Sequence, residues 1–250
     1  MNPLVRKLEN HVALSGAERR ALNVACSTAR RVAPREDLIS QGDKPRVVNL
    51  LLSGFAQRYK TLEDGRRQML ALLVPGDFCD LHNYVLDHMD HALATVTEAE
   101  VAVLTPDDLD ALIGSSPNVR RALWWSQLVD EAIAREWIVN VGQRSALERT
   151  AHLFCELFWR LRAVGLTKGD ACEMPFIQIE LADTLGLTAV HVNRMLQELR
   201  REGLITLRDR ALTIPDLPAL EGVALFDPTY LHLRRGQGRP EALRDSRERA

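Results

Sequence analysis

Apolar residues recur with a helical period at the start of the chain and with a strand period in the stretch that follows. Residues 3–30 have the helical spacing and predict short helices, one of which opens with a capping box of Ser15 and Glu18. From residue 33 to residue 104, short β-rich runs such as VVNLLL and QMLALLV replace this pattern. Short strands with this spacing predict a small β-barrel or sandwich.

Glycines mark the turns of this β-rich region. Gly42, Gly54, Gly65 and Gly76 recur at intervals of eleven or twelve residues. Asp64 and Gly65 stand at the centre of EDGRR, and this pair favours a tight hairpin turn. Residues 1–116 are therefore predicted to form one domain of N-terminal helices and short strands.

The next segment, residues 117–143, has apolar positions at steps of three and four without a break. It predicts a helix of about 25 residues, about 37 Å long at 1.5 Å per residue. Because little helix precedes it, we expect this helix to pair with a second copy of itself. The residues expected at that interface are Trp125, Val129, Ala132 and Ile133. Of the adjacent Trp124 and Trp125, one is expected to face the partner helix and the other the β-rich domain.

A second capping box, Ser145 with Glu148, opens another amphipathic helix, and the break before it predicts a domain boundary and hinge. Residues 144–214 are predicted to form a separate domain. Residues 215–233 contain enough apolar side chains to dock on another part of the chain. The charged remainder of the 215–250 extension is predicted to be disordered.

Residues 178–203 have the pattern of a helix-turn-helix. Gly186 is the turn residue, Ala182 is small where the two helices cross, and Thr188 is a natural N-cap for the second helix. The apolar contact positions are Leu181, Leu185, Leu187, Val192 and Met195. Gly203 ends the second helix, and residues 205–214 predict a β-hairpin wing. An ordinary pair of packed helices would explain neither the turn glycine nor the wing.

The exposed face of the second helix supplies candidate DNA contacts. The residues expected to read base edges are Val190, His191, Asn193 and Arg194. Arg194 can form a bidentate contact with guanine, Asn193 can bind an adenine or a phosphate, and Val190 can pack on a thymine methyl. The residues expected to bind phosphates are Gln178, Thr188, Arg200 and Arg201. Arg200 and Arg201 could instead be a solvated helix end that interacts with its own carbonyl dipole.

The overall composition limits the partners and the compartment. The net charge is −2, so a nucleic-acid partner must be met by a local basic patch. Four scattered cysteines, with no CxxC pair, fit a reducing compartment. The first residues lack the apolar core of a signal peptide, and no run approaches the length of a membrane span. We therefore expect a cytoplasmic protein with no membrane partner.

This order of segments resembles the Crp/Fnr family of bacterial transcription regulators over about residues 10–214. The matching motifs are DGRRQ and PGDF in the β-rich region, LERTAHLFCEL after the hinge and IELADTLGLTAVHVNRML in the helix-turn-helix. The first two look more like the Fnr/FixK side than the cyclic-AMP receptor side. The resemblance implies an α+β protein with a cyclic-nucleotide-binding-like β-roll, a dimerisation helix and a winged helix-turn-helix. It implies a homodimer on a pseudo-palindromic DNA site, allosteric control from the roll and contact with RNA polymerase.

Three departures from the family limit what can be transferred. Members usually have glutamate where this chain has Val190, so their base preference does not transfer. The loop at 79–95 lacks the arginine that cradles a cyclic phosphate, so cyclic-nucleotide binding is not expected. Cys26 is the single cysteine near the start, too few for an Fnr-type iron–sulfur cluster. No cofactor is therefore predicted, and the effector is unknown.

Other functions remain open at this point. The loop at 79–95 holds His82, His88 and His91 among aspartates, so a metal- or haem-dependent sensor variant is an alternative to a polar surface loop. A metal-dependent hydrolase would use the same region, although no catalytic motif supports an enzyme. A dimerising interaction module without DNA binding is a third class. Cys172, just before the helix-turn-helix, could be redox-active.

Overall fold

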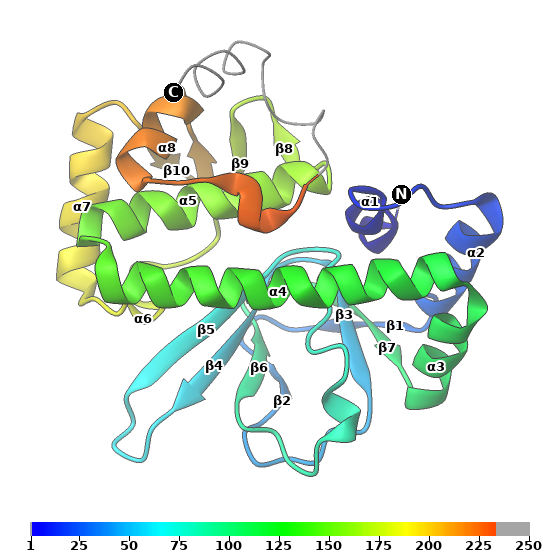
Figure 1. Cartoon of the computed structure of the whole chain (residues 1–250). Coiled ribbons are helices and arrows are strands. Elements are labelled where there is room, and N and C mark those ends of the chain that lie inside the picture. Colours follow the sequence, from blue (N-terminus) through cyan, green and yellow to red (C-terminus); the bar gives the residue numbers. More distant parts are fainter. Residues whose placement is uncertain (1, 234–250) are drawn as a thin grey trace.

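The computed structural model of the chain describes residues 2–233 (Figure 1). It begins with helices α1 (Pro3–Glu9) and α2 (Gly16–Ala25). Seven strands follow: β1 (Ala29–Val32), β2 (Asp37–Ile39), β3 (Val48–Ser53), β4 (Ala56–Thr61), β5 (Arg67–Leu73), β6 (Ala92–Thr95) and β7 (Ala99–Leu104). They form two antiparallel sheets, of order β1-β7-β3 and β2-β6-β4-β5. We call these strands and their loops the roll; a short helix, η1 (Asn83–Val85), interrupts one loop.

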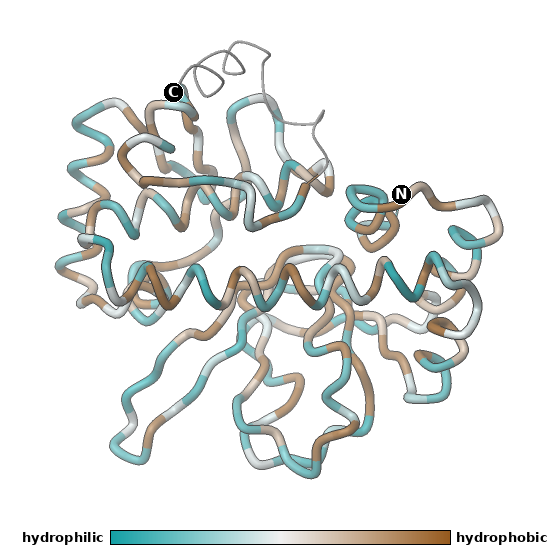
Figure 2. The backbone as a smooth tube through the Cα atoms, viewed as in Figure 1, coloured by the Kyte–Doolittle hydropathy of each residue, from teal (hydrophilic) through white to brown (hydrophobic). Residues whose placement is uncertain are grey.

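Two helices connect the roll to the C-terminal part of the chain. Pro106 starts α3 (Pro106–Ser115), where Thr105 and Asp108 form a capping box. The long helix α4 (Pro117–Gln143) then crosses the whole molecule, with the roll on one side and the C-terminal domain on the other (Figure 1). Figure 2 shows apolar positions recurring along the full length of α4.

The C-terminal domain, which we call the reader, comprises residues 145–233. Its helices are α5 (Ala146–Ala163), α6 (Gln178–Leu185), α7 (Ala189–Arg201), α8 (Leu217–Ala224) and the short η2 (Pro228–Leu231). Its strands are β8 (Thr167–Lys168), β9 (Ala171–Glu173), β10 (Thr206–Arg208) and β11 (Ala211–Thr213), in the sheet order β10-β11-β9-β8. Residues 215–233 dock on the reader, with α8 packed against α5 and η2 against both α4 and α5. The predicted disordered tail lies outside the described residues.

Strand assignment from sequence was wrong or incomplete at four places. β1 begins at Ala29, inside the span predicted to be helical, because three of its four residues are exposed and give no alternation. β2, β8 and β9 have only two or three residues each and were not predicted.

The hydrophobic core runs without interruption from the roll into the reader. One cluster joins Phe55, Met69 and Leu72 of the roll to Trp137 of α4 and Phe154 of α5. Two smaller clusters lie inside the roll and under α1–α4. The reader is therefore packed on the roll, and not merely tethered to it by a hinge.

This packing corrects the predicted dimer interface. Trp125, Val129, Ala132 and Ile133 are 4–9% exposed and lie in the core of their own chain. The expectation that these four residues pair with a second copy is therefore wrong for this structure. Trp125 stacks on His11, with ring centroids 5.0 Å apart, whereas Trp124 is 58% exposed.

Candidate nucleic-acid interface

The first helix of the predicted pair, α6, is fixed at both ends. At its start, Glu180 accepts a hydrogen bond from the backbone N–H of Ile177 at 2.9 Å. At its end, Gly186 has a φ of +62° and allows Leu187 N–H to bond Ala182 C=O. Arg149 of α5 donates to the last helical carbonyl, that of Leu185, at 2.8 Å. The turn between the helices is therefore set by a glycine and by a cation at the helix C-terminus.

The second helix, α7, has one buried and one open face. The Thr188 hydroxyl accepts from His191 N–H at 3.2 Å and caps the helix, as its sequence position predicts. The inner face packs on α5 and α6 through Val192, Met195, Leu196 and Leu199, all buried. This apolar anchoring leaves the opposite face of a regular helix free for a ligand.

The outer face of α7 presents the residues predicted to read bases. Val190 is 82% exposed and Arg194 is exposed, while His191 and Asn193 are half-buried. Arg194 has no hydrogen-bond or ion-pair partner within residues 2–233. Asn193 Oδ1 lies 3.5 Å from the donating Nε2 of Gln178, at the start of α6. The structure therefore brings one predicted base reader next to one predicted phosphate contact.

The predicted phosphate contacts at the end of α7 are partly occupied within the chain. Arg200 donates to Leu207 C=O of the wing at 3.4 Å, and Arg201 lies 3.9 Å from Glu202. Both arginines remain exposed, so these contacts leave them accessible to a phosphate. Arg200 therefore ties the wing to α7 as well as facing solvent.

Sequence reasoning missed two basic residues on the wing. Asp209 and Arg210 form its tip, with φ values of +49° and +62°. Arg210 in the tip and Arg208, at the end of the strand before it, are both exposed. The predicted β-hairpin was the available signal, because a wing next to a recognition helix places its tip near the DNA backbone.

Two family models match this chain, one over the roll and the other over the reader. Residues 29–116 match the family model of a cyclic nucleotide-binding domain, and residues 148–223 match that of a Crp-like helix-turn-helix domain. A probable transcriptional activator of Rhizobium leguminosarum bv. viciae is 30% identical over 210 residues, which cover 84% of this chain and 86% of that protein. The nitrogen fixation regulation protein FixK of Bradyrhizobium diazoefficiens is 31% identical, covering 76% of this chain and 78% of that protein.

The chain belongs to the Crp/Fnr family of transcription regulators. The resemblance to its Fnr/FixK side is confirmed by FixK and by the transcriptional activator protein FnrL of Cereibacter sphaeroides, which is 30% identical over 70% of this chain and 71% of that protein. The structure of FixK2 from Bradyrhizobium japonicum superposes with a TM-score of 0.70 at 24% identity, over 78% of this chain and 96% of that one. The predicted fold class is confirmed.

Membership of the Crp/Fnr family settles the class of function. The chain is a DNA-binding transcription regulator. The alternatives of a metal-dependent hydrolase and of an interaction module without DNA binding are therefore set aside. Within residues 2–233, no helix combines the length and apolarity needed to cross a bilayer.

The histidines of this family member's 79–95 loop do not converge. His91 contacts Asp80 at 2.9 Å and Asp90 at 2.8 Å, whereas His88 Nδ1 bonds Gly42 C=O at 3.1 Å. His82 instead lies against the rings of Tyr84 and Trp124. Across the described residues, no group of three or more metal-ligating side chains could hold a metal ion. The metal hypothesis for His82, His88 and His91 therefore finds no ligand set among the described residues.

The roll contains a buried arginine that sequence analysis did not single out. Arg58 of β4 forms an ion pair with Asp80 at 2.9 Å, donates a hydrogen bond to Phe78 C=O at 3.1 Å and lies 3.8 Å from Asp130 of α4. Burial lowers the pKa of Arg58, but Asp80 and Asp130 outweigh this and raise it. The cation in the roll is thus already neutralised by carboxylates of the same chain.

Cys172 is an unsuitable redox switch in this fold. It is 5% exposed, and burial raises the pKa of its thiol to about 12. Because the thiolate is the reactive form, the Cys172 side chain is in its inert form at neutral pH. It packs in the core beneath the wing, where its strand pairs with β11.

Proposed function

We propose that this protein is a homodimer that reads a two-fold pseudo-palindromic promoter site in the cytoplasm, under control of the roll. The observation that supports this most strongly is the division of α7 into an apolar inner face and an open outer face with Arg194 at its centre. An arginine with no intramolecular partner can give both its donor edges to a guanine.

The other side chains have roles that follow from their places. Val190 lies one helical turn before Arg194 and can pack on a thymine methyl. Asn193, with Gln178 beside it, can bind an adenine or bridge to a phosphate, and His191 lies at the edge of the same face. The phosphate contacts are Gln178, Thr188, Arg200 and Arg201, to which we add Arg208 and Arg210 of the wing.

A second apolar stripe on α4 supports the dimer. Trp124, Leu128, Ile138 and Val139 are 43–72% exposed and lie on one face of the helix, opposite the buried stripe. Glu131 and Arg135 form an exposed ion pair on that same face. Exposed apolar side chains in a row mark an interaction surface. We propose that two copies pair here, in parallel, in place of the interface predicted from sequence.

The names of the similar proteins indicate what effect a DNA-bound dimer would have on transcription. Several carry the names of transcriptional activators or nitrogen fixation regulators. This supports activation through contact with RNA polymerase. Since Arg58 is already paired with Asp80 and Asp130, a cyclic phosphate placed beside it would meet two carboxylates, which supports regulation without a cyclic nucleotide.

In-vitro selection from random duplex DNA, with purified protein and no added effector, tests the reading role. We expect a two-fold symmetric motif with a guanine in each half, its halves about one helical turn apart. Enrichment of a single unpaired half, or no enrichment by folded dimeric protein, would contradict the proposal.

Analytical ultracentrifugation tests the interface separately. Leu128→Asp places a charge in the exposed stripe and is expected to convert the dimer into a folded monomer. Val24→Asp is the matched control, since Val24 is an apolar side chain that is 72% exposed on α2, outside the exposed stripe of α4. Dimerisation of Leu128→Asp at wild-type concentrations would exclude this stripe as the interface.

A further inference from the structure

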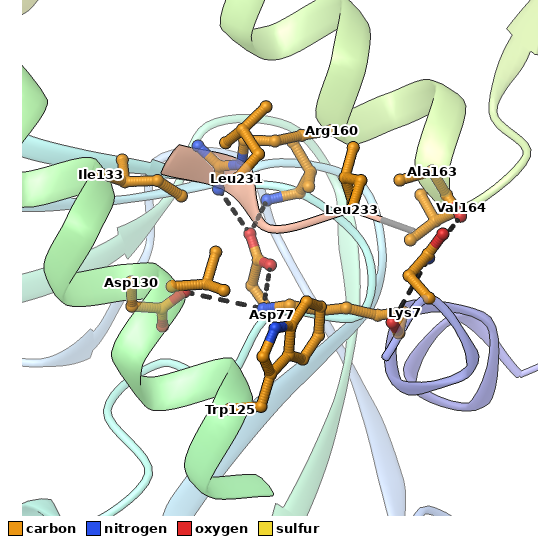
Figure 3. A pocket seen from close by; sticks show the side chains of 13 residues that line it. Lys7, Asp77, Trp125, Asp130, Ile133, Arg160, Ala163, Val164, Leu231 and Leu233 are labelled. Carbon is orange, nitrogen blue, oxygen red and sulfur yellow. Dashed lines mark hydrogen bonds and ion pairs between the residues drawn. The ribbon is translucent and has the colours of Figure 1, made fainter. Parts of the chain in front are cut away.

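A buried ion-pair cluster joins the reader to the roll. Asp77 lies between Lys7 Nζ of α1, at 2.8 Å, and Arg160 Nη2 of α5, at 2.7 Å (Figure 3). Lys7 also lies 3.6 Å from Asp130 of α4, and Arg160 bonds Glu156 at 3.0 Å. These five residues, from four separate elements, form what we call the seam.

The turn that presents Asp77 is shaped for this contact. Gly76 has a φ of +96°, and a Cβ at this position would meet Pro3 C=O at 2.8 Å. The Asp77 carboxylate also accepts from Val74 N–H at 2.8 Å, which closes the turn on itself. A glycine followed by an aspartate therefore lets α1 lie directly on the turn and brings Lys7 to Asp77.

Both cations of the seam are paired with carboxylates inside the protein. The side chains of Asp77, Arg160 and Lys7 are 3%, 10% and 12% exposed. Burial raises the pKa of Asp77, but Lys7 and Arg160 outweigh this and hold it at about 2. Arg160 also donates to Leu72 C=O of the roll at 2.8 Å. Removing the Asp77 carboxylate would leave two buried cations without their shared partner, so the arrangement tolerates little displacement.

Helix α1 adds hydrogen bonds to backbone carbonyls at the same junction. Arg6 donates to Val164 C=O at 2.9 Å, and Asn10 donates to Ala163 C=O at 3.0 Å. These carbonyls end α5, where a cation and hydrogen-bond donors are favoured. The hollow beside the seam offers about 30 Å³, which admits water but not an organic effector. The seam is therefore a connection and not a ligand pocket.

The orientation held by the seam suits DNA binding. The reader is packed on its own roll, yet the outer face of α7 remains open. In Figure 1, α7 lies beyond the C-terminal end of α4. Two copies paired in parallel along α4 would place both α7 helices at the same end of the dimer, as one two-fold DNA site requires.

We propose that Asp77, with Lys7 and Arg160, positions the reader so that the two α7 helices of a dimer engage both halves of one DNA site together. This rests on the proposed dimeric function. When the first reader binds, the second is held near its half-site at a high effective concentration. A loosened seam would lower that effective concentration and leave the contacts of each single reader unchanged.

The test compares two duplexes by fluorescence anisotropy: the selected full site and the same duplex with one half scrambled. The wild type is expected to bind the full site far more tightly than the half site. Asp77→Asn should weaken full-site binding about ten-fold or more and half-site binding less than about two-fold. Arg160→Lys, which keeps the charge, should retain part of the full-site preference.

Two further variants keep the test decisive. If Asp77→Asn does not fold, Lys7→Met serves instead, because it removes one partner and leaves the Asp77–Arg160 pair. Leu112→Ala is the stability control: it shortens a buried apolar side chain of α3, which makes none of the ion pairs of the seam. This control should lower stability and keep the ratio of full-site to half-site affinity.

The outcomes separate the two proposals. A wild type without full-site preference would overturn the dimeric function. A wild type with that preference, together with seam variants that keep the same ratio or bind the full site more tightly, would overturn the positioning role of the seam and leave the dimer intact.

Discussion

The outer face of α7 and the seam use the same residue type in opposite ways. Arg194 is exposed, without a partner in the described part of the chain, while Arg160 is buried and bonds Asp77, Glu156 and Leu72 C=O. A free arginine costs the fold nothing and is available to a ligand. A buried arginine already has its partners within the fold, and its removal leaves those carboxylates buried without a cation. Whether a charged side chain serves ligand binding or the fold therefore depends more on its solvent exposure, and on whether it already has partners within the chain, than on its residue type.

The largest effect is expected on the free energy of unfolding, from substitution of the buried Arg160. Arg160→Met should lower the free energy of unfolding by about 3–5 kcal/mol, since Asp77 and Glu156 lose their shared cation. Chemical denaturation followed by tryptophan fluorescence measures this. A loss below about 1 kcal/mol would show that water replaces the guanidinium and that the seam is not closed.

Substitution of the exposed Arg194 should weaken DNA binding and leave stability unchanged. Arg194→Ala is expected to cost about 1–3 kcal/mol per half-site on the selected DNA and little on random duplex. Its unfolding free energy should stay within about 0.5 kcal/mol of the wild type, as for other surface substitutions. Anisotropy titrations on both duplexes provide the measurement, and equal losses on both would remove Arg194 from base reading.

A buried histidine where α4 contacts α5 should make the stability of the fold depend on pH. His152 is fully buried, with Nδ1 3.0 Å from Asn140 Nδ2, and burial, followed by the charge of Arg144, lowers its pKa to about 3. The folded protein keeps His152 neutral, whereas the unfolded chain protonates it below about pH 6.5. Stability from this group is therefore present above pH 6.5 and is lost as the pH falls toward 3.

The size of this loss can be measured between pH 7 and pH 5. Over that interval His152 should cost the wild type about 2 kcal/mol of unfolding free energy, which His152→Gln should not lose. Because burial raises the pKa of Glu156, that group acts in the opposite direction in both proteins, and the difference between them isolates His152. Parallel pH profiles would contradict a neutral buried imidazole.

The smallest effect is expected from a partly exposed ion pair between the roll and the reader. Arg67 of the roll lies 2.9 Å from Asp183 of α6, with side chains 34% and 23% exposed. Arg67→Gln should change stability by less than about 1 kcal/mol, since water screens the pair. A loss equal to that of Arg160→Met would show that burial does not distinguish the two contacts.

Local signals explain why the reader was predictable. The N-cap Thr188, the turn Gly186 and the apolar spacing of α6 and α7 all act within a few residues, and α7 begins directly after the predicted cap. Exposure of Val190 and Arg194 follows from the same periodicity. Whether the eight predicted DNA contacts touch DNA stays a prediction.

The proposed dimer face of α4 shows what hydrophobic periodicity cannot decide. The helix has two apolar stripes, one with Trp125 and Val129 and the other with Trp124 and Leu128. A sequence pattern identifies both, but which stripe is buried within the chain depends on where the reader and α1 pack. The sequence prediction selected the stripe that the reader covers.

The seam could not have been predicted from the sequence. Asp77 is separated from Lys7 by 70 residues and from Arg160 by 83, and within the seam only the Glu156–Arg160 pair has a local helical spacing. Arg58 was missed for the same reason, because its partners come from a loop and from α4. Such contacts exist only after the tertiary fold has formed.

The place of α1 has a consequence for how the protein is made. Its hydrogen bonds to the end of α5 join residues 153 and 158 positions apart, so α1 gains these partners only after α5 has been synthesised. At about 5–20 residues per second, that interval is roughly 10–30 s. Until then Lys7 and Asp77 lie next to each other without Arg160, so the seam can close only after α5 has been synthesised and has folded.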